Sequence, residues 1–274
     1  PTPPPPRPPP PHRPPPPPAE LSPPQDAFSH AMLTRPPLHI VHLNSMALGN
    51  IDLALKMLED SQNQGYRITS EVYPYTAAST ALESAMFNPG WQERLGMDYE
   101  DLQWVATGER LNKDTYEAYR KEGGIVIMHM MQPEWIAKGL SAEGIAIASD
   151  GMMYAPLAHP RTAGTFTRVL GKYVREDQTL DLMSALKKMT LIPAKILEDI
   201  APVMLQKGRL QEGADADITI FNPETIRDRA TFDGGLKFSK GVTYVMVGGV
   251  LVLDQGKTVP NQYPGQPIFG KYRQ

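Results

Sequence analysis

The residues whose types and positions could support chemistry are polar side chains that close short apolar runs. Asp150 follows the run 144–149, and His42 ends the run Leu38-His-Ile-Val. In a sheet surrounded by helices a charged residue is tolerated mainly at a strand end, and in (β/α) barrels the carboxyl ends of the strands carry the active site. Asp150 is therefore a catalytic carboxylate or a helix cap, and spacing alone favours the cap. His42 is a metal ligand or a core or loop histidine, and its type alone favours the latter.

A predicted α/β arrangement positions these side chains. Residues 38–42 and 67–73 have the pattern of strands on either side of an amphipathic helix at 51–64. This makes a βαβ unit, which implies parallel pairing. The second strand is followed by a polar loop at 74–80. Further along, the pattern predicts buried strands at 125–128 and 144–149, polar helical segments within 91–123, and helices at about 165–175, 180–190 and 193–199.

The last part of the chain has a different, all-β texture. Gly248-Gly249 separates two of its apolar runs and is typical of a tight hairpin. The predicted strands are 216–221, 242–247 and 250–253.

Composition excludes several classes of protein. The 274 residues are 41% hydrophobic, enough for a large core. A net charge of −3 argues against nucleic acid or an anionic membrane surface as the main partner, and no apolar run approaches the ~18 residues of a spanning helix. Because cysteine is absent, any metal must be held by histidine and carboxylates. We expect a cytoplasmic protein, since the composition is compatible with a reducing compartment.

The first residues differ from the rest, because 16 of the 29 prolines lie within residues 1–25. Proline fixes φ and lacks an N–H, so we predict a disordered segment at 1–27. It is a linker, an upstream segment that is foreign to the domain that follows, or a PxxP ligand flanked by Arg7 and Arg13. The predicted division is 1–27, an α/β part at 28–205 and a β part at 206–274.

Six stretches together resemble the D-aminoacylase (N-acyl-D-amino-acid deacylase) branch of the amidohydrolase superfamily. They occur in the order of that family and span roughly residues 36–265. The stretches are Tyr73-Pro-Tyr-Thr-Ala-Ala-Ser-Thr80, Ser149-Asp150-Gly151, His159-Pro-Arg-Thr-Ala-Gly-Thr-Phe166, Arg168-Val-Leu-Gly-Lys-Tyr-Val-Arg-Glu176, Lys188-Met-Thr-Leu-Ile-Pro-Ala194 and Lys207-Gly-Arg-Leu-Gln-Glu-Gly-Ala-Asp-Ala-Asp-Ile-Thr-Ile-Phe221.

The resemblance implies hydrolysis of an N-acyl amino acid at a zinc site in a TIM-type barrel that is followed by part of a small β-sandwich. Zinc activates water in such enzymes, and the resemblance makes Asp150 the general base and His42 a zinc ligand. Tyr73 and Ser79 match residues that contact substrate. Arg161 matches an arginine that pairs with the substrate carboxylate, a task that suits a planar guanidinium.

Several features of the family are missing from the sequence. We find no His-x-His pair with a nearby acid, so we expect only the last three or four barrel strands and expect the remaining zinc ligands in a missing N-terminal half. An incomplete barrel exposes a strand edge that invites self-association. The alternative to an amide hydrolase is a catalytically inactive barrel fragment, or a partner-binding protein that uses its proline-rich tail or exposed edge. His159 is predicted to order the loop of Arg161, whereas Glu71 and His129 are predicted to be structural.

Overall fold

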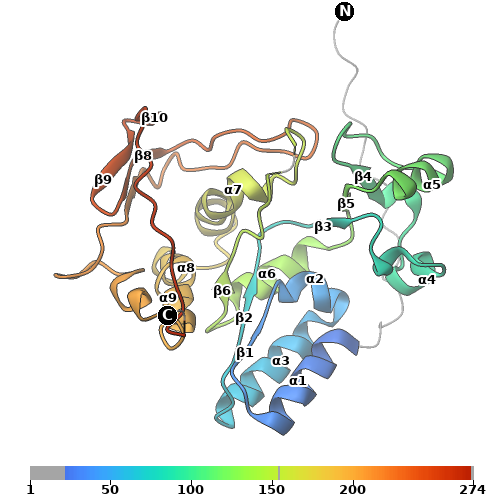
Figure 1. Ribbon diagram of the computed structural model, residues 1–274, viewed down its shortest axis with the longest axis horizontal. Coiled ribbons are helices and arrows are strands. Elements are labelled where there is room, and N and C mark those ends of the chain that lie inside the picture. Colours follow the sequence, from blue (N-terminus) through green and yellow to red (C-terminus); the bar gives the residue numbers. More distant parts are fainter. Residues whose placement is uncertain (1–21, 154, 273–274) are drawn as a thin grey trace, which may run out of the picture.

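The structure is a computed structural model that describes residues 22–153 and 155–272 (Figure 1). Three parallel strands form its central sheet, in the order β1-β2-β6. Figure 1 shows α1, α2, α3 and α6 on one side of these strands and α8 and α9 on the other. The strands are β1 (Leu38–Ile40), β2 (Ile68–Val72) and β6 (Ala146–Ile147), and the first helices are α1 (Ser22–Thr34), α2 (Leu43–Ala47), α3 (Ile51–Asn63) and α6 (Pro133–Ser141).

The predicted βαβ unit is confirmed as β1-α3-β2, with Leu38 opposite Ile68 in the parallel register. Helix α3 forms because Ile51, Ala54 and Leu58 recur at helical spacing, and all three are buried against the sheet. On β2, burial alternates along the strand, so one face is covered by helices and the other is half-buried. The chain continues from this half-buried face of β2 into the residues that follow the strand.

Two strand predictions need correction. The strand expected at 144–149 is limited to β6, Ala146–Ile147, so Asp150 lies in the loop beyond it. Part of the polar loop expected at 74–80 is strand β3 (Ala78–Ala81). Strand β3 is recruited by pairing with a distant strand, a tertiary effect that local polarity does not report.

The strand predicted at 125–128 exists as β5 (Ile125–Met128), but it does not join the parallel sheet. It is the middle of an antiparallel sheet, β3-β5-β4, with β4 at Leu102–Trp104. Among the described residues three strands pair in parallel, whereas three or four barrel strands were expected. Around this second sheet, Trp91 stacks on Tyr116 and Trp104 stacks on Tyr119. The surrounding helices are η2 (Ala85–Phe87), α4 (Trp91–Leu95), η3 (Tyr99–Asp101) and α5 (Lys113–Glu122).

After β6 the chain forms a series of helices that cover the sheet. The helix expected at about 165–175 begins earlier and changes to π geometry midway, whereas the bounds of the other two shift by one or two residues. The elements are α7 (Arg161–Arg168), the π-helix η4 (Val169–Glu176), α8 (Leu182–Met189), α9 (Leu191–Leu197) and the 3-10 helix η5 (Pro202–Gln206).

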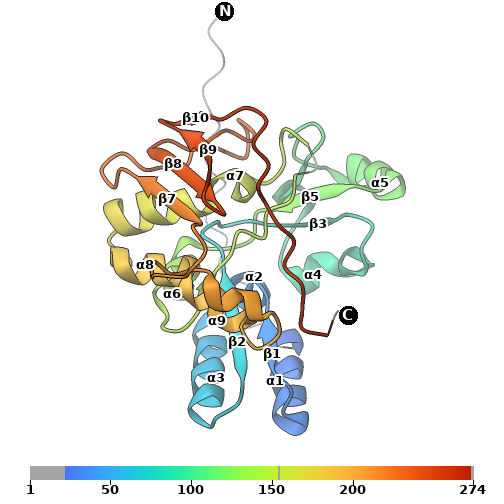
Figure 2. The same cartoon turned by 60° about the vertical axis from the view of Figure 1, so that its left-hand side comes forward.

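The β-rich texture of the last part is confirmed as a four-stranded antiparallel sheet, β10-β9-β8-β7. Gly248 and Gly249 both have positive φ, 55° and 80°, which makes the predicted hairpin between β8 and β9. After β10 the chain returns to the helices, where Lys271 N donates to Ile200 O at 2.8 Å (Figure 2). The strands are β7 (Ile218–Phe221), β8 (Val242–Val247), β9 (Val250–Asp254) and β10 (Lys257–Thr258).

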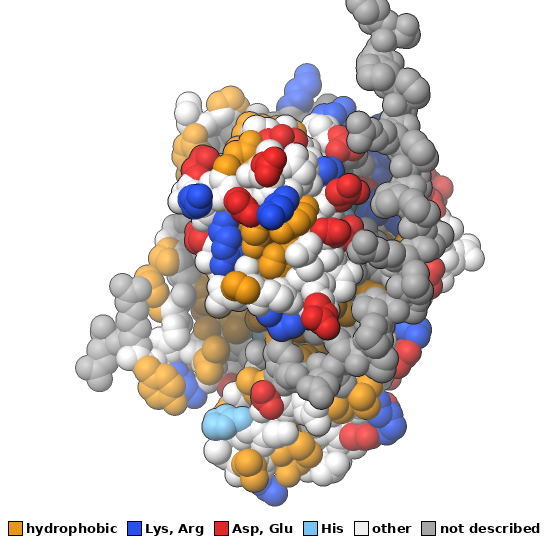
Figure 3. Space-filling view, turned by 90° about the vertical axis from the view of Figure 1, so that its right-hand side faces the viewer, with side chains coloured by type: hydrophobic (Ala, Val, Ile, Leu, Met, Phe, Trp, Pro, Cys, Tyr) orange, Lys and Arg blue, Asp and Glu red, His pale blue; other side chains and the backbone are white. Residues whose placement is uncertain are grey.

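Helix α1 corrects the segment 1–27 that we expected to be disordered, since it begins at Ser22. Its Phe28 and Ala31 are buried in the main core, and such burial outweighs the effect of two early prolines. The rest of the proline-rich segment, residues 1–21, lies outside the described residues. None of the described helices is long and apolar enough to cross a membrane. The face shown in Figure 3 intersperses acidic and basic side chains and shows no block of one sign.

Candidate functional site

Three of the predicted site residues follow the carboxyl ends of the three parallel strands. His42 comes two residues after β1, Tyr73 directly after β2, and Asp150 three residues after β6. Because the strands are parallel and adjacent, these ends lie along one edge of the sheet. In α/β sheets this edge is where ligands bind, since loops there can change without disturbing the core.

Two of these residues hold a backbone conformation that non-glycine residues rarely adopt. The φ angle is 38° at His42 and 46° at Asp150. Residues held in this region are enriched at functional sites. The loop of Asp150 is also held tightly, because a Cβ added to Gly151 would come within 2.8 Å of Thr162 Cα on α7. The carboxylate is thereby brought beside the first turn of that helix.

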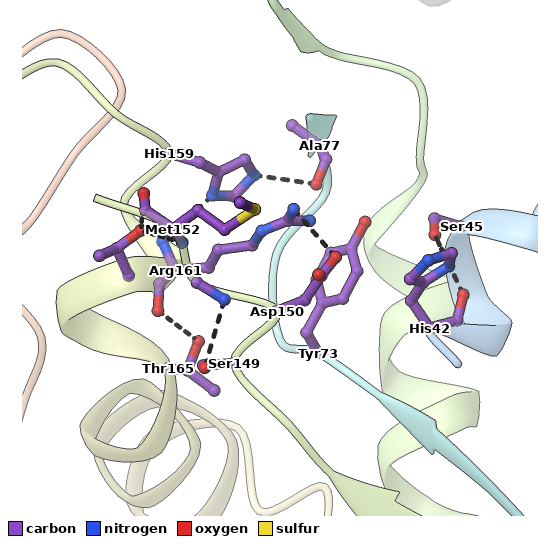
Figure 4. Close-up of polar contacts among 12 residues, drawn as sticks. His42, Ser45, Tyr73, Ala77, Ser149, Asp150, Met152, His159, Arg161 and Thr165 are labelled. Atoms are coloured by element: carbon purple, nitrogen blue, oxygen red, sulfur yellow. Dashed lines mark hydrogen bonds and ion pairs between the residues drawn. The ribbon is translucent and has the colours of Figure 1, made fainter. Parts of the chain in front are cut away.

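Asp150 forms an ion pair with Arg161, the first residue of α7. Arg161 Nη2 lies 2.9 Å from Asp150 Oδ2, and the exposed fractions are 5% for the arginine side chain and 32% for the aspartate side chain (Figure 4). The pair is therefore asymmetric, with a buried cation and a carboxylate that faces partly toward solvent. A buried guanidinium needs a counter-charge, and here Asp150 supplies it.

The Arg161 guanidinium also packs on Tyr73, with its Cζ 4.7 Å from the ring centroid. This cation–π contact stabilises the charge without using an N–H. Two buried polar atoms at this point, Arg161 Nε and the Tyr73 hydroxyl, have no hydrogen-bond partner. Burial raises the pKa of the Tyr73 hydroxyl to about 12, so it stays a neutral donor. Unpaired buried donors of this kind are costly in a finished core and are expected where a ligand binds.

His159 fixes the segment that carries Arg161, as the sequence predicts. Its Nδ1 accepts from the Arg161 backbone N–H at 3.1 Å, and its Nε2 donates to Ala77 O at 2.9 Å. One ring nitrogen accepts and the other donates, which describes a neutral imidazole. Burial, together with the nearby Arg161 charge, lowers the pKa of His159 well below its usual value of 6.5. His159 therefore acts as a neutral spacer between α7 and the loop after β2.

A cavity of about 220 Å³ opens beside the guanidinium. Ser79 on β3 and Arg161 on α7 both line it, so the structure brings these two predicted residues to one site. Asp150 and Tyr73 belong to the same site because both contact Arg161. The other lining residues are Thr80, Ala81, Val105, Ile125, Met152, Ala158 and His159.

His42 lies apart from this group. Its Nδ1 is 3.1 Å from Ser45 Oγ, and in Figure 4 the Tyr73 ring lies between His42 and the Asp150–Arg161 pair. With Nδ1 occupied, Nε2 is the atom that could bind a metal. Among residues 22–153 and 155–272, however, no group of three or more histidine and carboxylate side chains could hold a metal ion. Zinc takes about four ligands, so the described residues do not make up a zinc site.

Both residues expected to be structural have protein partners. His129 Nε2 lies 3.0 Å from Gln103 Oε1, and burial lowers the pKa of His129 to about 3. Glu71 Oε2 lies 3.3 Å from His39 Nε2 on the neighbouring strand. Sequence reasoning missed Phe232, whose ring centroid lies 5.1 Å from that of His159. No local signal marks Phe232, because it comes from a loop between β7 and β8 and meets the site only in the fold.

The fold and the site together define an α/β protein with a carboxylate–arginine pair at the carboxyl edge of a parallel sheet. The sequence matches the amidohydrolase family over residues 26–253. The chain belongs to the amidohydrolase family.

Three curated relatives are deacylases of Alcaligenes xylosoxydans xylosoxydans. N-acyl-D-glutamate deacylase is 31% identical over 81% of this chain and 44% of its own length. N-acyl-D-aspartate deacylase is 30% identical over 74% and 41%, and D-aminoacylase is 29% identical over 73% and 42%. The chain thus spans less than half the length of these relatives.

Solved structures give the same picture. N-acyl-D-glutamate deacylase from Bordetella bronchiseptica, complexed with zinc and a phosphonate inhibitor, superposes with a TM-score of 0.71 and 26% identity, covering 86% of this chain and 51% of that one. A D-aminoacylase structure has a TM-score of 0.74 at 23% identity, covering 89% and 52%. The second likeness speaks for the fold alone.

Proposed function

We propose that this chain provides the base and the carboxylate-binding arginine of a metal-dependent amide hydrolase that acts on N-acyl amino acids. The observation that carries the proposal is the Asp150–Arg161 pair of 2.9 Å at the carboxyl edge of the parallel sheet. The named activities of the relatives, deacylation of N-acyl-D-glutamate and N-acyl-D-aspartate, support it.

Arg161 has the geometry to hold the substrate carboxylate. Its Nη2 is used by Asp150, its Nε is buried and unpaired, and the arginine lines the cavity. A carboxylate that enters the cavity can share the guanidinium with Asp150, which keeps the two carboxylates close to one cation. Ser79 on the cavity wall and the neutral Tyr73 hydroxyl are the further donors that we assign to substrate binding.

Asp150 has the position of a general base. Its side chain is one-third exposed, so a water molecule can approach it, and its partner Arg161 is fixed by His159 and Tyr73. A carboxylate in this setting can take a proton from water and pass it to the leaving amine. The close packing of Gly151 against Thr162 fixes the loop that carries the carboxylate.

Zinc is the metal that we propose for the intact active site, with His42 Nε2 as one ligand, because the Bordetella relative was solved with zinc. The described residues supply no complete ligand set. This favours a second candidate, in which the chain alone is catalytically inactive. If the purified chain contains less than ~0.1 zinc ion per molecule, it is not an active enzyme by itself, since one histidine cannot replace about four zinc ligands.

The fold supports a finer proposal. We assign β1, β2 and β6 to the last strands of a TIM-type barrel, and β7–β10 to part of a β-sandwich. In the described structure β1 is an outer strand of its sheet and is half-buried at Leu38 and His39, so we also propose self-association through this barrel edge. Cytoplasmic localisation remains part of the proposal.

Binding and turnover test this function separately. Calorimetry should show that N-acetyl-D-leucine binds the chain, and that Arg161→Met reduces affinity by at least ~10-fold, the low end for losing a charged hydrogen bond. Arg67→Met is the matched control, because Arg67 forms an exposed pair with Asp199. Equal losses for the two variants would refute the role of Arg161.

For turnover, Asp150→Asn should leave metal content unchanged and lower the rate at least ~10²-fold in a preparation that hydrolyses N-acetyl-D-amino acids. A loss under about twofold would remove Asp150 from the mechanism, because general bases contribute about 10²–10⁴-fold.

A further inference from the structure

The cavity beside Arg161, named here the side-chain pocket, has an uneven lining. Arg161 is the single cation among the described residues that line it. Most of the remaining wall is apolar and comes from Ala81, Val105, Ile125 and Ala158. Val105 and Ala158 are almost completely buried, so the apolar wall is part of the core and is held rigidly.

The imidazole of His159 cannot serve as a second cation. Its Nε2 proton is given to Ala77 O and its Nδ1 accepts from the Arg161 backbone, so a second ring proton would have no acceptor. The adjacent Arg161 charge opposes protonation as well. The part of the pocket formed by described residues therefore has a single positive charge, and Asp150 already shares it.

The relatives do not decide which amino acid fits, because their named substrates differ at nearly equal identity. The glutamate, aspartate and general D-amino-acid enzymes match at 31%, 30% and 29%. A glutamate or aspartate derivative brings two carboxylates. If Arg161 binds the first, the second enters an apolar wall without a counter-ion, and burying an unpaired carboxylate is strongly unfavourable.

We propose that the side-chain pocket selects N-acyl amino acids with a neutral, apolar side chain and rejects those with an acidic side chain. This inference rests on the proposed function, in which Arg161 holds the α-carboxylate. The size of the pocket, about 220 Å³, is below the roughly 300–1,000 Å³ of pockets for drug-sized ligands and suits a small side chain, so the selection between leucine and glutamate rests on charge.

The test compares N-acetyl-D-leucine with N-acetyl-D-glutamate by calorimetry on the full chain. We expect the leucine derivative to bind at least ~10-fold more tightly, because the second carboxylate loses its hydration without gaining a partner. Thr80→Lys adds a cation at the half-buried β3 wall of the pocket, and it should erase or reverse this preference. Thr80→Met is the matched control of similar length without charge, and it should keep the preference.

The outcomes separate this inference from the proposed function. Suppose that N-acetyl-D-glutamate binds as tightly as N-acetyl-D-leucine and that Arg161→Met weakens this binding. That result would overturn the proposed selectivity of the pocket and leave the role of Arg161 intact. A preference for leucine that Thr80→Lys does not change would also overturn it. If neither ligand binds, or if Arg161→Met weakens neither, the proposed function itself fails. Thermal melts of each variant check that the fold is retained.

Discussion

Replacing Asp150 by Asn perturbs the site with little change of shape. Asn tolerates positive φ as well as Asp does, so the φ of 46° adds no new strain. Breaking a buried ion pair costs about 3–5 kcal/mol and an exposed pair about 0–1 kcal/mol. Here the arginine is 5% exposed and the aspartate 32%, and the cation–π contact with Tyr73 survives. We therefore expect a loss of about 2 kcal/mol in the free energy of unfolding, between those two ranges.

Urea denaturation measures this loss, and Asp52→Asn is the control. Asp52 pairs with Lys138 at the surface, with 66% and 47% of the side chains exposed, and should lose less than ~1 kcal/mol. N-acetyl-D-leucine should stabilise Asp150→Asn more than the wild type, because its carboxylate replaces the missing counter-ion of Arg161. Equal losses in the two variants, or equal stabilisation by the ligand, would refute the argument that Arg161 is a buried cation shared between Asp150 and substrate.

Three other predictions concern packing, pH and association. Gly164→Ala should lower stability by about 1–3 kcal/mol in urea denaturation, because the new Cβ would collide with the Tyr75 hydroxyl and come within 2.9 Å of Asp228 Cβ. As pH falls from 6.5 toward about 3, His129 binds a proton in the unfolded chain but not in the folded one, so the free energy of unfolding should fall by up to ~1.4 kcal/mol per pH unit. Urea melts at a series of pH values should show a smaller fall for His129→Gln than for the wild type. Sedimentation equilibrium should show self-association that Val41→Lys weakens, since Val41 is exposed beside the outer strand β1; a monomer at all concentrations would contradict it.

The elements that sequence reasoning predicted well are those with strong local periodicity. Helix α3 and strands β1 and β2 follow from apolar spacing alone, and Gly248-Gly249 marks the hairpin between β8 and β9. The position of His42, Tyr73 and Asp150 after apolar strands follows from the same reasoning, since charged and polar groups must lie beyond the buried part of a strand. Local pattern thus determined which side chains stand at strand ends.

The pairing partners of β5 were beyond the reach of the sequence. Strand β5 has the same apolar pattern as a parallel barrel strand, yet it pairs antiparallel with β3 and β4. Apolar content reports burial, whereas direction and sheet membership depend on contacts between residues far apart in the chain. Helix α1 begins earlier than predicted for the same reason, because the burial of Phe28 and Ala31 depends on contacts with distant residues.

The sequence by itself determined the chemistry available to this protein. It has a net charge of −3, no cysteine, and a histidine, an aspartate and an arginine in the chain order of a deacylase family. The tertiary structure alone decided how these groups meet. It buried the Arg161 cation against Tyr73, turned Asp150 toward it, held His159 neutral and left His42 to one side. Ionic and hydrogen-bond geometry depends on distances of a few ångströms between distant segments, and those distances exist only once the core has packed.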